Sequence, residues 1–259
     1  MADHVQLGYV RTWYDEQGRG EPLVLLHPGG AGVDSRAFGP NLGALAERFH
    51  VFTPERRAHG RTPDVAGPIT FEAMAQDTIA FLETVVGGSA HLVGSSDGAI
   101  VALLVALRRP DLTRRLVLVA GVFHVDGWAP GVIDPANEPP EFLARLYAEV
   151  SPDGAEHYPV VVEKLAQLHL VEPALAAGDL NAIRNRALVM VGDDDEVTLE
   201  HAVAMYRGLG DAELMVVPGT SHGLLVEKPQ LCNRAIVEFL TTEPIETRAP
   251  IRRSPSGHR

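Results

Sequence analysis

The residues that are best suited to catalyse a reaction lie in the pentapeptide Gly94-Ser95-Ser96-Asp97-Gly98. An aliphatic run ends at Gly94, and a long apolar segment with helical character begins after Asp97. A serine on so sharp a turn from strand to helix has strained backbone angles, and the residues two before and two after it must be small. Gly94 and Gly98 meet that demand for Ser96, whereas Ser95 would have Asp97 in one of those positions. Ser96 is therefore the candidate nucleophile, and an ordinary glycine-serine turn is the alternative.

A serine hydroxyl needs an adjacent base, and histidine has a pKa near the working pH. Active groups in an open parallel sheet gather at the carboxyl ends of the strands. His222 meets this rule because it follows the last expected strand, in the loop 218–223. His27 and His59 also follow strands, but we expect them to support neighbouring loops. The other histidines that we weighed are expected inside a strand or in a helical insertion, in structural roles or occasionally in contact with substrate: His91, His124, His157 and His169.

The acid that would orient this base is expected in the loop after the next-to-last strand. Four acidic residues follow Gly192 there, and most of such a run should form a solvated loop. One carboxylate can still turn inward toward His222, and Asp195 is the candidate. The fallbacks are Asp194, Asp193 and, more remotely, Asp126.

Acyl transfer also requires backbone N–H groups that face the developing oxyanion. The amide of Asp97 begins the helix after Ser96, where free N–H groups and the helix dipole favour negative charge. A second donor is expected from the turn 27–30, in which Pro28 has no N–H. We choose Gly29, with Gly30 next, and a plain tight turn is the alternative interpretation.

The elements around these residues alternate between strand and helix. Residues 4–14 alternate in polarity and 15–20 break the pattern, which predicts a β-hairpin. Further strands are expected at 22–26, 49–54, 90–94, 115–120, 187–191 and 213–217, and helices at 71–86, 97–108, 198–208 and 224–240. Strands that are apolar on both faces belong to parallel sheets covered by helices. The pattern therefore predicts an α/β fold, a mostly parallel sheet with helices on both faces.

Residues 123–185 break this alternation, with helices expected at 141–150 and 158–170. We predict a helical cap there, a core formed by 1–122 and 186–240, and a flexible tail at 241–259. The tail contains arginines, but we favour a solvated end over a nucleic-acid arm. The cap region supplies aromatic residues that could line a pocket for a small or medium, largely apolar substrate, although such residues more often form a core: Phe123, Trp128, Phe142, Tyr147 and Tyr158.

The bulk composition narrows the classes of partner. The chain has 259 residues, of which 46% are hydrophobic and 22% charged, with a net charge of −12. This charge argues against nucleic acid or an anionic membrane as a partner. Cys232 is the single cysteine, so it forms no disulfide framework, and we expect an inert core thiol. The N-terminus lacks the pattern of a signal peptide and no apolar run could span a bilayer, so we expect a cytoplasmic protein.

Taken together, these pieces resemble the α/β-hydrolase fold family, in its capped, lipase- or esterase-like branch. The likeness extends from about Val5 to Leu240, and the order Ser, Asp, His is the family's own. It includes the loop Arg57-Ala58-His59-Gly60-Arg61-Thr62, which is similar to the family's Arg-Gly-His-Gly-x-Ser loop. Pro28 and Ala58 stand where glycines are usual. The resemblance implies an eight-stranded, mostly parallel sheet with the cap inserted after the sixth strand.

The expected activity is that of a serine hydrolase acting on a carboxylic ester, lactone or related acyl bond. Ser96 attacks, His222 takes its proton and Asp195 fixes the imidazole tautomer; no metal or organic cofactor is implied. The partner is a small molecule, and a homo-oligomer is compatible with the sequence. The family also supplies alternatives: a cofactor-free perhydrolase or haloperoxidase, a carbon–carbon bond hydrolase, or a catalytically silent receptor for a small ligand.

Overall fold

The computed structural model describes residues 2–134 and 136–250, and eight strands in this part of the chain form one sheet. Their order across the sheet is β1-β2-β4-β3-β5-β6-β7-β8. The pairs β1–β2 and β2–β4 are antiparallel, and all others are parallel. The strands are β1 Asp3–Leu7, β2 Val10–Gly18, β3 Glu21–Leu26, β4 Phe49–Pro54, β5 Ala90–Ser95, β6 Thr113–Val119, β7 Arg186–Gly192 and β8 Ala212–Val217. The predicted mostly parallel sheet is confirmed.

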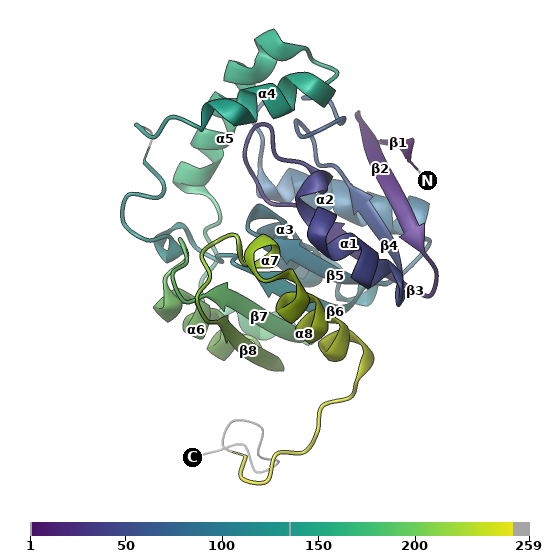
Figure 1. Ribbon diagram of the computed structural model, residues 1–259, viewed down its shortest axis with the longest axis vertical. Coiled ribbons are helices and arrows are strands. Elements are labelled where there is room, and N and C mark those ends of the chain that lie inside the picture. The colour runs from purple at the N-terminus through teal and green to yellow at the C-terminus, as the bar shows by residue number, and fades with distance from the viewer. Residues whose placement is uncertain (1, 135, 251–259) are drawn as a thin grey trace.

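Helices cover both faces of this sheet, as predicted (Figure 1). Successive strand residues point to opposite faces, so a strand that is buried on both faces contributes to two hydrophobic clusters. In β3, Val24 and Leu26 belong to one cluster, and Leu23 and Leu25 belong to the other. The first cluster packs under α2 Phe71–Phe81, α3 Asp97–Arg108 and α6 Leu199–Gly208, and the second under α1 Gly39–Ala46, α7 Leu224–Glu227 and α8 Pro229–Thr241.

Three elements differ from the prediction by more than a shift of one or two residues at an end. The expected helix 224–240 is two helices, because Lys228 precedes Pro229 and leaves the helical region at φ −131° and ψ 59°. The expected helix 71–86 is α-helical only to Phe81 and continues as a π-helical turn, η2 Leu82–Val86. The hairpin strand does not stop at residue 14: β2 runs to Gly18 because its second half pairs with β4.

Between β6 and β7, residues 123–185 form the insertion predicted to be a cap. It contains α4 Glu141–Val150 and α5 Tyr158–Val171, whose bounds are close to the expected ranges. The two helices lie beyond one end of the strands (Figure 1). The insertion also contains three short helical turns: η4 Val125–Gly127 before α4, η5 Ala155–His157 between the two helices and η6 Asp179–Ala182 after α5. Other such turns are η1 Ser35–Phe38 and η3 Pro110–Leu112 in the rest of the chain. The Arg36 side chain, after β3, donates hydrogen bonds to Leu146 O and Glu149 of α4, which places the insertion over the carboxyl end of β3.

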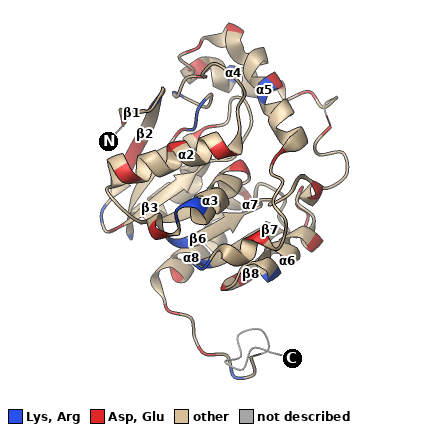
Figure 2. Cartoon of the chain, turned by 180° about the vertical axis from the view of Figure 1, so that it is seen from behind, with Lys and Arg blue, Asp and Glu red and all other residues tan. Residues whose placement is uncertain are grey.

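Beyond the last helix, the segment 242–250 has neither helix nor strand, and the predicted tail continues into residues 251–259, which lie outside the described part. The start of this segment is held to the sheet, because the carbonyl of Thr242 accepts hydrogen bonds from Arg115 and Arg186. Figure 2 shows acidic residues on α2, on α6 and on the insertion, in keeping with the net charge of −12. None of the helices within 2–134 and 136–250 is long and apolar enough to cross a membrane.

Candidate active site

Ser96 is at the turn between β5 and α3, with φ 53° and ψ −120°. This conformation is rare for a residue with a side chain, and the turn is tight on both sides. A β-carbon at Gly94 would come within 2.1 Å of the Gly98 carbonyl oxygen, and one at Gly98 within 1.9 Å of the Leu26 oxygen. The Ser96 N–H donates to the carbonyl oxygen of Val119 at 2.8 Å. Glycine is therefore required at both positions because the backbones approach closely, and the serine is fixed at the carboxyl end of β5.

The three side chains predicted to act together lie in one hydrogen-bonded line. The Ser96 hydroxyl donates to His222 Nε2 at 3.0 Å, and His222 Nδ1 donates to Asp195 Oδ1 at 2.8 Å. The Asp195 carboxylate is fully buried and also accepts from the N–H groups of Gly192, at 2.9 Å, and Val197, at 3.0 Å. The loops after β5, β7 and β8 thus bring together residues that are more than 120 positions apart, since His222 and Ser96 are separated by 126.

The charge of Asp195 makes the His222 imidazole a stronger base. Burial raises the pKa of Asp195, but the hydrogen bond and charge of His222 outweigh it, so the pKa lies below its ordinary value. Burial lowers the pKa of His222, but the hydrogen bond and charge of Asp195 prevail, and this pKa lies above its ordinary value. An ionised carboxylate thus faces an imidazole that holds a proton more tightly than a free histidine. Such a pair suits a group that takes a proton from a hydroxyl.

The fallback acids have other partners. Asp193 accepts a hydrogen bond from the N–H of Thr220 at 3.0 Å. Asp126 lies 3.3 Å from His124 at an exposed position, and Asp194 donates its N–H to the carbonyl of Thr220. The geometry therefore favours Asp195 as the orienting acid.

Arg56 holds the turn that was expected to supply the second oxyanion donor. Its guanidinium donates to the carbonyl of His27 at 2.5 Å and to that of Pro28 at 2.9 Å. His27 Nδ1 also donates to the Pro28 carbonyl, because its Nε2 is occupied as acceptor of the Arg56 N–H. In a trans peptide the C=O and the N–H point in opposite directions. With the Pro28 oxygen turned toward Arg56, the N–H of Gly29 points away from it.

The Asp97 side chain packs on the same turn. A β-carbon at Gly29 would lie 1.9 Å from Asp97 Oδ2, so the carboxylate covers the Gly29 α-carbon. The amide of Asp97 is the first of α3 and has no acceptor within the helix. Gly29 and Asp97 thus lie against each other and present the two candidate N–H donors. Gly30 has φ 106° and its carbonyl accepts from the N–H of Val33, which closes the turn.

A cluster of buried charges lies beneath this turn. Burial raises the pKa of Asp97, yet the charge and hydrogen bond of His169, with Arg56, lower it to about 2. Burial lowers the pKa of Arg56 to about 10 against the opposing effect of Asp97. Burial and the charge of Arg56 lower the pKa of His59 to about 4. At neutral pH the cluster therefore contains a carboxylate, a guanidinium and a neutral His59.

Two members of this cluster escaped the sequence analysis in their present roles. Arg56 is the second residue after β4, next to the loop that carried the family likeness, and only its position after a strand could have drawn attention to it. For His169, the sequence predicts a structural role or a contact with substrate. Its Nε2 donates to Asp97 Oδ1 at 2.9 Å. Sequence contains no signal for this contact, because it depends on how the end of α5 lies over the sheet.

The aromatic residues expected to line a pocket are dispersed. The Trp128 ring lies 5.8 Å from the His222 ring, centroid to centroid. Phe123 is buried and stacks on His201 at 4.0 Å, and Tyr147 is buried against Tyr158 at 5.5 Å. Phe142 is 49% exposed on α4. Of these five residues, Trp128 is the one whose ring contacts a ring of the candidate triad, that of His222.

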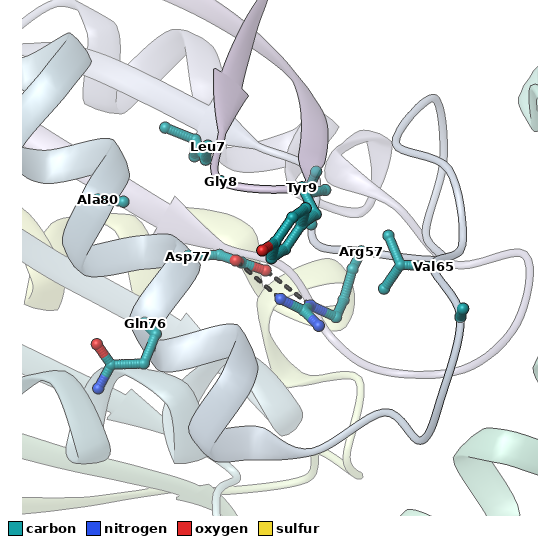
Figure 3. A pocket seen from close by; sticks show the side chains of 10 residues that line it. Leu7, Gly8, Tyr9, Arg57, Val65, Gln76, Asp77 and Ala80 are labelled. Carbon is teal, nitrogen blue, oxygen red and sulfur yellow. Dashed lines mark hydrogen bonds and ion pairs between the residues drawn. The ribbon is translucent and has the colours of Figure 1, made fainter.

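A separate cavity of about 690 Å³ lies between the β1–β2 turn, the loop after β4, and α2 (Figure 3). Arg57 and Asp77 meet in its wall through two hydrogen bonds of 2.8 and 2.9 Å. Tyr9 stands beside them and is 99% exposed. The charged groups of this cavity neutralise each other, and it contains none of the predicted site residues.

Comparison with known proteins places this arrangement in a wider group. A model of the alpha/beta hydrolase family matches residues 23–235. The chain is 27% identical over 94% of its length, and over the whole of the relative, to "(E)-2-((N-methylformamido)methylene)succinate hydrolase" of Acinetobacter baylyi. It is 29% identical to "Putative carbamate hydrolase RutD" of Caulobacter segnis, over 85% of this chain and 92% of that one.

Among solved structures, a meta-cleavage product hydrolase from Pseudomonas fluorescens superposes with a TM-score of 0.77. The superposition covers 92% of this chain and 97% of that one, at 22% sequence identity. This likeness concerns the fold, and it agrees with the eight-stranded sheet described above.

Proposed function

This chain belongs to the alpha/beta hydrolase family, and we propose that it cleaves a carboxylic ester, lactone or related acyl bond through an acyl-enzyme on Ser96. The observation that supports this most directly is the line from the Ser96 hydroxyl through His222 to Asp195, with hydrogen bonds of 3.0 and 2.8 Å. Within this line a weak nucleophile has a base at hydrogen-bond distance, and the base has an anionic partner.

In the first half of the reaction, Ser96 Oγ bonds to the carbonyl carbon while its proton moves to His222 Nε2. The carbonyl π electrons move to the oxygen, which becomes an oxyanion. The tetrahedral intermediate collapses, the bond to the leaving group breaks, and His222 gives the proton to the departing oxygen or nitrogen. The acyl group is then joined to Ser96 as an ester.

In the second half, a water molecule replaces the leaving group. His222 takes a proton from this water, whose oxygen attacks the acyl carbon. The new tetrahedral intermediate releases the Ser96 oxygen, which recovers its proton from His222, and the free acid leaves. Asp195 stays ionised throughout and stabilises the imidazolium each time it forms.

The oxyanion is assigned to the N–H groups of Gly29 and Asp97. The clamp of Arg56 on the Pro28 carbonyl supports Gly29 as a donor, because it directs the following N–H away from Arg56. The position of Asp97 at the start of α3 supports the second donor. Preorganised donors of this kind are worth on the order of 100-fold or more in kcat each.

A second candidate substrate class has its acyl carbon bonded to nitrogen. The names of the two relatives above, a carbamate hydrolase and a formamido-methylene succinate hydrolase, both contain such a carbon. The same Ser96 chemistry serves it, because His222 can protonate a departing nitrogen. We keep the ester or lactone as the first candidate, since its leaving group departs more readily.

The test combines an active-site probe with a substrate panel. A fluorophosphonate should label the wild-type protein and the Ser95→Ala variant, and Ser96→Ala should abolish labelling. The panel pairs an aryl ester, an enol lactone, an aryl carbamate and a vinylogous diketone, with hydrogen peroxide added in a parallel assay. Hydrolysis of the ester or lactone supports the proposal. Labelling without turnover of any member would favour a silent receptor, and cleavage of the diketone alone would favour a carbon–carbon bond hydrolase.

A further inference from the structure

Two histidine–aspartate hydrogen bonds of the same length join the α5 region of the insertion to the core. His169, in the last turns of α5, donates from Nε2 to Asp97 Oδ1 at 2.9 Å. His157, directly before α5, donates from Nε2 to Asp64 Oδ2 at 2.9 Å. The first bond reaches the residue that follows Ser96, and the second is in a loop after β4. The two bonds match in residue types and length and differ in the aspartate that they reach, Asp97 or Asp64, so one can serve as the control for the other.

The carboxylate that His169 holds is deeply buried. The Asp97 side chain is 2% exposed, and no described group hydrogen-bonds its Oδ2 atom. His169 thus donates a hydrogen bond to this carboxylate, while Arg56 stabilises it through its charge. A buried carboxylate with so few partners depends strongly on each of them, because an unpaired buried charge is costly.

The position of this carboxylate is tied to both candidate oxyanion donors. Asp97 carries one of the two amides on its own backbone, and its Oδ2 lies against the α-carbon of Gly29, which carries the other. Gly29 therefore has the Asp97 carboxylate against its α-carbon, and it directly follows the carbonyl group that Arg56 clamps. A shift of the carboxylate would change the distance between the two N–H groups.

We propose that His169 is a positioning residue: from the insertion, it holds the Asp97 carboxylate against Gly29 and so sets the spacing of the amides that receive the oxyanion. This inference rests on the proposed function of Ser96. In this role, His169 makes kcat depend on the position of α5. It also separates two effects, because a residue that positions oxyanion donors acts on the transition state, whereas a mere anchor of the insertion acts on substrate access.

The experiment compares His169→Ala with the matched control His157→Ala. The readouts are kcat and KM on the best ester of the panel, and the inhibition constant of phenylboronic acid. A boronic acid forms a tetrahedral adduct with the serine hydroxyl, and one of its oxygens takes the place of the oxyanion. His169→Ala should lower kcat and weaken boronic acid binding in parallel, by about 10-fold, with a smaller change in KM. His157→Ala should leave kcat and boronic acid binding within about twofold of wild type.

Conservative variants protect the test from general damage to the fold. Glutamine at 169 carries its amide nitrogen near the position of Nε2, so His169→Gln should restore kcat to within about threefold of wild type. In an Asp97→Asn background, where the carboxylate charge is gone and the backbone amide remains, His169→Ala should have a smaller effect than in the wild type. Loss of kcat in His169→Ala without rescue by glutamine would contradict the proposal.

The outcomes also separate this inference from the function on which it depends. If the fluorophosphonate does not label Ser96 in the wild-type protein, the proposed function fails. If Ser96 is labelled and the His169→Ala and His157→Ala variants have equal kcat and equal affinity for phenylboronic acid, the function stands and the positioning role of His169 is refuted.

Discussion

The carboxylate of Asp97 covers the α-carbon of Gly29 so closely that a β-carbon there would lie 1.9 Å from Oδ2. The residue after the candidate nucleophile and the turn after β3 therefore fit together as one unit. This relationship explains why glycine is needed at position 29 for reasons of space, since its φ is not in the left-handed region.

Gly29→Ala should lower kcat/KM by about 100-fold, because the new methyl group must displace the carboxylate or the turn. In an Asp97→Ala background the same methyl group has room, so the two substitutions should combine to less than the sum of their separate free-energy effects. Gly39→Ala is the control, because a β-carbon there meets no atom within 4 Å. Strict additivity of Gly29→Ala and Asp97→Ala would argue against the packing described.

Arg56→Met should destabilise the fold by about 3 kcal/mol, because it removes the side-chain donor to the His27 carbonyl and one of the two donors to the Pro28 carbonyl. It also leaves a buried carboxylate with less compensating charge. Urea unfolding measures the change. Arg114→Met removes an exposed ion pair with Glu21 and should cost less than about 1 kcal/mol. Equal losses for the two variants would mean that Arg56 has no special structural role.

The acid limb of the pH–rate profile should report His222. The base must be neutral, and Asp195 raises its pKa, so kcat/KM should rise with pH through a midpoint above the ordinary value of 6.5. Asp195→Asn removes the anion that favours the imidazolium, so the midpoint should move down while kcat falls by as much as about 10⁴-fold. Glu200→Gln, an exposed change on α6, is the control. A midpoint that stays in place in Asp195→Asn would assign the limb to another group.

The stability contributed by the His169–Asp97 pair should depend on pH in a defined direction. Burial opposes the raised pKa of His169, but the charge of Asp97 prevails, so its contribution is present below the unfolded pKa and is lost as pH rises through the folded pKa. The lowered pKa of Asp97 gives the opposite sign: its contribution is lost as pH falls from the ordinary 3.8 toward about 2. Arg56 and the neutral His59 are the other titratable groups that face the pair.

Urea unfolding of wild type and His169→Ala should therefore differ most between about pH 4 and pH 6.5, and less at pH 9. A difference that grows at alkaline pH would contradict the charged pair.

Much of this structure could be predicted from local sequence. The strand-to-helix turn at Ser96 and the apolar runs on both faces determine the sheet, because each is a short-range pattern with one good structural solution. The break at Lys228 was missed although Pro229 was visible, since apolar periodicity continues across it. The order of loops along one sheet edge was enough to bring His222 and Asp195 to Ser96.

What sequence could not supply was the way the insertion lies over the core. The contact between His169 and Asp97 depends on the direction of α5, and the two residues are 72 positions apart. No periodicity records that direction. Arg56 is similar, because its role depends on the carbonyls of another loop, 28 and 29 positions earlier in the chain.

Trapping of the covalent intermediate on Ser96 is the decisive measurement for the proposed nucleophile. The wild-type protein is mixed with a slowly deacylating aryl ester, quenched in acid and digested, and the peptide containing Ser96 is weighed by mass spectrometry. We expect an added acyl mass on Ser96 that appears with the first turnover and is absent from Ser96→Ala. Continued turnover with no adduct on Ser96, or an adduct that persists in Ser96→Ala, would contradict this expectation.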